Sequence, residues 1–251
     1  MAPYTIRQIQ TGWQFLDKGQ YATYGQGHGQ VIKHPVFSFL IEGEGNRILV
    51  DTGMSDTEHS VRFHHDGLQE QGQAIQDQLA KVGLEPDDVD IVIFTHLHWD
   101  HCYNLDKFQR PRLLVSDAEY RFALDPIPFY WKSYEAPQTG LVRPFEGRKF
   151  ELLRGDEEIT KGVRVFPTPG HSVGHLAVEV DTSSGKYVIA GDLAYLIENF
   201  ERDEARGWPL TPPGRFANIV DWWRSMELVK ERADHILLSH DPKQLAKETY
   251  P

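Results

Sequence analysis

Three histidines and an aspartate crowd into the stretch THLHWDH, where they stand at positions His96, His98, Asp100 and His101. They come directly after the apolar run IVIF, which is typical of a buried strand. Burying imidazole and carboxylate groups without partners is costly, so their concentration at a strand end predicts a metal site. Imidazole with carboxylate suits zinc, iron or manganese, and the lack of thiolates argues against a structural zinc cage.

Further residues of the same chemistry follow three later apolar runs. His171 lies in TPGHSVGH, Asp192 ends VIAGD and His240 ends ILLSH. Strand ends at one edge of a sheet can converge, so we expect these side chains to meet the THLHWDH cluster. Taken singly, His171 or His240 would more often be an ordinary hydrogen-bonded histidine. Seven candidate ligands together exceed the needs of one tetrahedral ion and indicate two ions that share a carboxylate.

The elements that must position these residues are read from the apolar pattern. Continuous apolar runs predict strands at 35–42, 47–51, 91–94, 113–116, 163–168, 175–180, 187–192 and 235–240. Residues 67–83 are expected to contain a helix, with Ile75, Leu79 and Val82 on one face and a stop at Gly83. A second helix is expected within 214–234, with an apolar stripe of Phe216, Ile219, Trp223, Met226 and Val229.

These elements predict one mixed α/β domain over residues 1–251, with helices outside stacked sheets. Two segments, 118–150 and 196–215, are rich in aromatic residues and proline and poor in periodicity. Long irregular segments in a compact domain are usually functional, so we expect both to form loops around a substrate pocket.

Composition excludes several classes of protein. The net charge of -11 argues against a nucleic-acid partner, which would favour clustered Lys and Arg. No apolar stretch approaches the length of a membrane span, and the first residues lack the pattern of a signal peptide. The single cysteine, Cys102, excludes an internal disulfide and is expected to be a packed side chain. These features predict a cytoplasmic protein that does not bind membranes.

The order THLHWDH, TPGH, GD and SH, preceded by VDTG at 50–53, resembles the metallo-β-lactamase superfamily. The resemblance implies a four-layer αββα sandwich. It implies that His96, His98 and His171 hold one divalent ion, that Asp100, His101 and His240 hold another, and that Asp192 bridges the two. The ions are expected to be zinc, with iron, manganese or cobalt as alternatives. Asp51 is expected to orient a ligand, and His175 to support the site without binding metal.

One branch of the superfamily is especially similar. Tyr195 stands three residues after Asp192 in GDLAY, as in N-acyl homoserine lactonases, and GQVIKHPVFSFLIE with the later SHD resembles the group that opens pyridoxolactone. This resemblance implies a hydrolase of a small-molecule lactone, N-acyl homoserine lactone foremost, and a homodimer. Tyr195 would donate to the oxyanion and Asp100 would move a proton. Tyr103 and Asn104 depart from the small residues usual after HxHxDH, and Tyr103 is expected to add bulk near the site.

Two alternatives stay open at this point. A hydrolase of a phosphoester or thioester would need the same ions but a different pocket. An iron-dependent oxidoreductase would use a single ion. A metal count separates the second alternative from the first.

Overall fold

The computed structural model describes residues 4–251, and its strands form two sheets. The larger sheet contains β1 (Thr5–Asp17), β2 (Val31–Gly43), β3 (Asn46–Val50), β4 (Gly67–Leu68), β5 (Ile91–Ile93), β6 (Arg112–Ser116), β7 (Glu151–Leu153) and β13 (Thr249–Tyr250). The strand order is β13-β1-β2-β3-β5-β6-β7, and β4 pairs with β1. Strands β1, β2 and β3 pair antiparallel, whereas β3, β5, β6 and β7 run parallel.

The smaller sheet has the order β12-β11-β10-β9-β8. Its strands are β8 (Glu157–Thr160), β9 (Val163–Pro167), β10 (Leu176–Thr182), β11 (Gly185–Ile189) and β12 (His235–Leu237). Strands β8 to β11 pair antiparallel, and β12 joins β11 in parallel. Strands β9, β11 and β12 therefore end at the same edge of this sheet.

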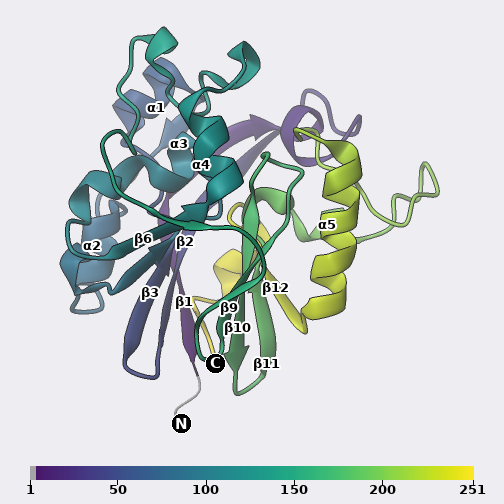
Figure 1. Cartoon of the computed structure of the whole chain (residues 1–251). Helices are drawn as coiled ribbons and strands as arrows, with labels where there is room; N and C mark the ends of the chain where they lie inside the picture. Colours follow the sequence, from purple (N-terminus) through teal and green to yellow (C-terminus); the bar gives the residue numbers. More distant parts are fainter. Residues whose placement is uncertain (1–3) are drawn as a thin grey trace.

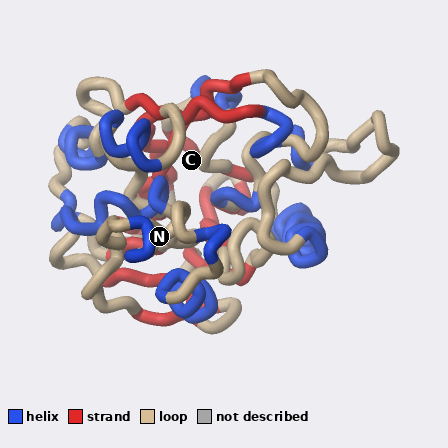
Figure 2. Tube along the Cα trace, turned by 90° about the horizontal axis from the view of Figure 1, so that it is seen from above, coloured by secondary structure: helices blue, strands red, loops and turns tan. Residues whose placement is uncertain are grey.

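Helices cover the outer face of each sheet (Figure 1). The α-helices are α1 (Thr57–Phe63), α2 (Ile75–Ala80), α3 (Trp99–Cys102), α4 (Asp117–Leu124) and α5 (Ile219–Arg232). Short 3-10 turns are η2 (Pro86–Asp88), η3 (Tyr103–Lys107), η4 (Pro128–Tyr130), η5 (Pro137–Thr139), η6 (Gly191–Leu193), η7 (Ile197–Phe200) and η8 (Pro242–Ala246), and η1 (Lys18–Ala22) is a π-helical turn. Seen from above, helices lie on both sides of the strands (Figure 2).

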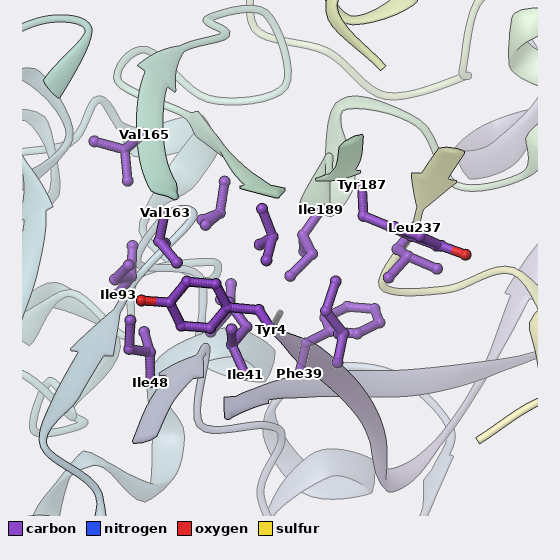
Figure 3. Close-up of a cluster of buried hydrophobic side chains, with 14 of the residues drawn as sticks. Tyr4, Phe39, Ile41, Ile48, Ile93, Val163, Val165, Tyr187, Ile189 and Leu237 are labelled. Carbon is purple, nitrogen blue, oxygen red and sulfur yellow. The ribbon is translucent and has the colours of Figure 1, made fainter. Parts of the chain in front are cut away.

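The main core lies between the two sheets, where their inner side chains face each other (Figure 3). Phe39, Ile48 and Ile93 come from the larger sheet and meet Val165 and Ile189 of the smaller one. Each strand buries its other face as well. In β5, for example, Val92 packs outward with the helices while Ile91 and Ile93 point inward. Burial on both faces explains the continuous apolar runs, and the four layers confirm the predicted αββα sandwich.

Two local predictions were incomplete. The sequence pattern missed β1, the 13-residue strand that pairs with β2 along its whole length. The helix expected within 214–234 starts only at Ile219, after its N-cap Asn218, and its buried face differs from the predicted stripe. Trp222 is buried instead of Trp223, and Ile219 is exposed. The buried residues of α5 are Trp222, Ser225, Met226 and Val229.

The helix expected within 67–83 is shorter than predicted. It covers Ile75–Ala80 and is followed by a turn that ends at Gly83, whose φ of 77° lies in the left-handed region that favours glycine. The segment 118–150 is also less irregular than expected, since its first seven residues belong to α4. Within residues 4–251, no helix combines the length and the apolar character needed to cross a membrane.

Candidate metal centre

Polar side chains gather where strands of both sheets end. In the larger sheet, Asp51 follows β3 and the THLHWDH stretch follows β5. In the smaller sheet, His171 follows β9, Asp192 follows β11 and His240 follows β12. Because β3 and β5 are parallel, and β9, β11 and β12 share their direction, these ends meet at one edge of the sandwich. The predicted convergence of the four segments is what the structure contains.

Seven side chains form two groups, each able to hold one ion. Site A consists of His96, His98 and His171, and site B of Asp100, His101, Asp192 and His240. All seven residues are buried. In site A, His98 Nδ1 lies 3.0 Å from His96 Nε2 and 3.1 Å from His171 Nε2. In site B, His101 Nε2 and His240 Nε2 each lie 3.1 Å from Asp192 Oδ1.

Asp192 faces both sites. Its Oδ1 lies in site B, while its Oδ2 is 3.6 Å from His171 Nε2 of site A. Within site B, the buried atom Asp192 Oδ1 faces His101 Nε2 and His240 Nε2 at 3.1 Å each, but none of these three atoms forms a well-aligned hydrogen bond with the described residues. Buried polar atoms without partners are costly, and a cation placed among them would satisfy all three. The residues therefore fit a pair of ions with a shared carboxylate.

The electrostatics of the two sites differ. In site A, burial lowers the pKa of His171 to about 3 and those of His96 and His98 well below their ordinary value. All three rings are thus neutral, which is the form that binds metal. In site B, burial works to lower the pKa of His101, but the Asp192 and Asp100 carboxylates outweigh it and raise that pKa well above normal. Site B therefore attracts positive charge.

Hydrogen bonds behind the ligands decide which ring nitrogens face the sites. Asp51 accepts hydrogen bonds from Thr95 N at 2.8 Å and Thr95 Oγ1 at 2.7 Å, and His101 Nδ1 donates to it at 2.8 Å. The expected role of Asp51 in orienting a ligand agrees with this geometry. His240 Nδ1 donates to Pro35 O at 2.8 Å. Both rings thus direct Nε2 toward Asp192.

Glycine is required immediately before Asp192. Gly191 has a φ of 52°, and a Cβ there would lie 2.8 Å from His175 Nε2 and 3.1 Å from Thr95 side-chain atoms. His175 is itself buried, and its Nδ1 lies 2.9 Å from Thr168 Oγ1. It belongs to neither site A nor site B, in keeping with its expected supporting role.

Tyr195 lies against the ligand rings. Its ring stacks on His240 at 5.5 Å and 18° and meets His171 edge-on at 5.9 Å. Burial, followed by the Asp192 carboxylate, raises the pKa of Tyr195 well above its ordinary value, so the hydroxyl stays protonated and able to donate. Asn199 fixes the backbone here, because its Oδ1 accepts from Tyr195 N at 3.0 Å and Leu196 N at 2.9 Å.

A cavity of about 280 Å³ opens beside the two sites. Its lining comes from β1, η1, the α1–β4 turn, the THLHWDH stretch, the two predicted loops and the GDLAY stretch. The lining residues are Gln14, Leu16, Gln20, Tyr21, His64, His65, His98, Trp99, Asp100, Phe129, Lys132, Ser133, Asp192, Tyr195 and Arg215. Segment 118–150 supplies Phe129, Lys132 and Ser133, and segment 196–215 supplies Arg215. Tyr103 is not among these lining residues, so the bulk that it adds does not narrow this cavity. Its neighbour Asn104 instead donates to Thr52 O and Met54 O, both at 2.9 Å.

Two supporting residues escaped the sequence analysis. Gln14 Nε2 donates to Asp100 Oδ2 at 2.7 Å, but Gln14 belongs to the missed strand β1. Glu119 is fully buried in α4 and accepts from Ser172 Oγ at 2.7 Å and Leu97 N at 3.1 Å. It thereby ties the loop before His98 to the loop after His171. The sequence around Glu119, with Ala118 before it and Tyr120 after it, gave no signal of this role.

The chain belongs to the metallo-beta-lactamase superfamily, whose sequence model matches residues 31–240. Within that class, an N-acyl homoserine lactonase of Bacillus thuringiensis is 32% identical to it over 226 residues, which cover 86% of this chain and 85% of that protein. The N-acyl homoserine lactonase AttM of Rhizobium radiobacter is 27% identical over 239 residues, covering 86% of each.

A solved structure supports the same relationship. An N-acyl homoserine lactone hydrolase, with the product N-hexanoyl-L-homoserine at its catalytic metal centre, superimposes with a TM-score of 0.79. It is 26% identical in sequence, and the match covers 98% of this chain and 96% of that chain. The chain is thus similar to these lactonases over nearly its whole length.

Proposed function

We propose that this protein is a dinuclear metal-dependent hydrolase that opens a lactone ring, with an N-acyl homoserine lactone as its first candidate substrate. The observation that carries the proposal is the position of Asp192 between sites A and B, with the Tyr195 ring against His171 and His240. A shared carboxylate suits two ions better than one, which disfavours the single-iron oxidoreductase. The names of the relatives support the same activity.

Two zinc ions held by these residues would lower the pKa of water from ~15.7 to roughly 7 and polarise the lactone carbonyl. The protein's own groups would do the rest. Tyr195, protonated because of its raised pKa, donates a hydrogen bond to the oxyanion that develops from the carbonyl oxygen. As water adds to the carbonyl carbon and the ring C–O bond breaks, Asp100 accepts the proton from that water and passes it to the departing ring oxygen. Gln14 Nε2 holds Asp100 Oδ2 in place at 2.7 Å.

The cavity sets an expectation for the substrate's size. Its volume of about 280 Å³ is just below the ~300–1,000 Å³ usual for ligand pockets. We expect lactones with short substituents to be hydrolysed faster than those with long acyl chains.

A phosphoester is the second candidate, and one observation favours it. Arg215 and Lys132 both line the cavity, and they donate to neutral acceptors, Ser133 Oγ and His64 O. Arg215 Nη2 donates to Ser133 Oγ at 2.8 Å, which leaves its charge available to an anionic group. The net charge still argues against a polyanionic nucleic-acid substrate.

A pH-stat assay on protein of known metal content tests the proposal. The substrates are homoserine lactones of short and long acyl chain, γ- and δ-lactones, a phosphodiester and a thioester. Acid release from lactones that stops on chelation and returns with zinc is the expected result. Hydrolysis of the phosphodiester alone would move the function to the second candidate. Gel filtration of the same sample tests the expected homodimer. The expected cytoplasmic location stays a prediction.

A further inference from the structure

A third group of metal-binding side chains lies outside sites A and B. It consists of His59, His64 and Glu135, and one donor atom of each lies within 4.8 Å of the others. His64 Nε2 is 2.8 Å from Glu135 Oε1, and His59 Nε2 contacts the same oxygen. The side chains of His64 and Glu135 are 1% and 2% exposed, while His59, at 17%, leaves a route to solvent.

The backbone departs from regular structure at two of the three positions. His59 and His64 are five residues apart, so on a continuous helix their side chains would point about 140° apart. α1 ends at Phe63, however, and His64 adopts φ −126° and ψ −98°, which returns its ring to the side of His59. Glu135 has a φ of 47°, a left-handed conformation that is costly for a residue with a Cβ. Both irregular residues direct their side chains to one point.

Aromatic rings hold this arrangement in place. The His64 ring stacks on Trp99, with ring centres 4.0 Å apart and planes at 6°. The His59 ring packs on Tyr103 at 4.7 Å. Tyr103, the bulky departure noted in the sequence, therefore supports this cluster instead of the cavity wall. Ligand rings fixed by neighbouring side chains are a feature of preformed metal sites.

The chemistry of the cluster matches a known set of zinc ligands. Two imidazoles and one glutamate, with a fourth position left for water, are one of the ligand sets that bind zinc in enzymes. The contact of 2.8 Å between nitrogen and oxygen is similar to the 3.1 Å between His101 Nε2 and Asp192 Oδ1 in site B. Burial lowers the pKa of His64, which keeps its ring in the neutral form that binds metal.

We propose that His59, His64 and Glu135 bind a third divalent metal ion of the zinc class, separate from sites A and B. His64 also lines the cavity beside Trp99, so an ion held there would fix one wall of that cavity. The inference concerns metal binding alone and does not depend on lactone hydrolysis.

Metal counting on the full chain tests this. The protein is stripped with a chelator, reloaded with Zn²⁺ until free zinc is in excess, desalted and analysed by mass spectrometry of the metal. We expect about three ions per chain for the natural protein and about two for His59→Gln and Glu135→Gln. Matched controls are His28→Gln and Glu204→Gln, whose side chains are 67% and 83% exposed. Both controls should keep the full count.

Two results would overturn the proposal: two ions in the natural protein at excess zinc, or no loss of an ion in both cluster variants. Because a variant could unfold, anomalous scattering at the zinc edge from crystals of the natural protein gives a second measurement. A peak among the three side chains is expected, and hydrogen bonds without a peak would contradict the assignment. Three bound ions without activity on any lactone would contradict the proposed function and still support the third metal site.

Discussion

His101 Nδ1 donates to Asp51 Oδ2 across 2.8 Å, and this one contact directs the other ring nitrogen, Nε2, to Asp192. Asp51 has a φ of 61°, a region that asparagine also tolerates, so Asp51→Asn should keep the backbone. The amide N–H group of the new asparagine would face the His101 Nδ1–H group, so the hydrogen bond that orients His101 would be lost. We expect the affinity of site B for zinc to fall by ~10- to 100-fold, measured by competition with a chromophoric chelator. Asp181→Asn, at an exposed position of β10, is the control, and equal affinity in both variants would contradict the role of Asp51.

Removal of the shared carboxylate should affect both sites together. Asp192→Ala deletes Oδ1 from site B and Oδ2 beside site A. We expect the purified variant to lose most of both ions by elemental analysis, while Asp181→Ala keeps them. Full occupancy of both sites in Asp192→Ala would exclude the bridging position of this carboxylate.

The tyrosine hydroxyl should matter for turnover and not for metal binding. Tyr195→Phe keeps the ring that stacks on His240 and removes only the donor. On the best lactone we expect kcat to fall by ~10- to 1,000-fold with unchanged metal content, as for other oxyanion donors. Tyr187→Phe is the matched control, because the Tyr187 ring packs against His235 and Tyr250 and does not line the cavity. A kcat equal to that of the control would remove Tyr195 from the mechanism.

Asn199 should act through Tyr195. Besides accepting from Tyr195 N, it donates to Ala22 O and Thr211 O, both at 2.8 Å. Asn199→Ala leaves these buried groups unpaired, so the free energy of unfolding should fall by ~2 to 4 kcal/mol in a urea titration. Asn199→Ala should also lower kcat in the natural protein. The same substitution should lower kcat much less in the Tyr195→Phe variant. Additive losses of kcat in the double variant would show that Asn199 acts elsewhere.

Stability of the metal-free protein should fall in mild acid, partly through His34. Burial lowers the pKa of His34 from 6.5 to about 4. The unfolded chain therefore binds a proton as pH falls below 6.5 while the folded chain does not, and stability present above pH 6.5 is lost toward pH 4. Between pH 7.5 and 5, the contribution of His34 to the free energy of unfolding falls by about 2 kcal/mol. Urea titrations with chelator present should show a smaller loss for His34→Asn than for the natural protein or His28→Gln; equal losses would exclude His34.

The sequence predicts the strands of the sandwich and the convergence of its ligands because both have strong local signatures. Buried strands such as Ile91–Ile93 are continuous apolar runs, and the polar groups that follow them stand out. The position of Trp222 could not be read in the same way. Two adjacent tryptophans fit the helical stripe about equally well, and only the packed fold shows that Trp222 is buried and donates to Leu193 O.

Residues that support the site from a distance were harder to predict. The strand β1 contains glutamine and threonine among its apolar residues, which hid both the strand and the contact of Gln14 with Asp100. His64 and Glu135 meet His59 only because of irregular backbone at a helix end and in a loop. Such geometry has no periodic pattern from which it could be predicted.

The ligands of sites A and B lie far apart along the chain: His98 and His171 are separated by 73 residues. Ions that join them would act as cross-links closing long loops of chain. Such cross-links can form only after the two sheets have docked, which is late in folding. Bound metal should therefore slow unfolding strongly and leave the rate of refolding nearly unchanged. The metal-bound protein would therefore stay folded under denaturing conditions because it unfolds slowly.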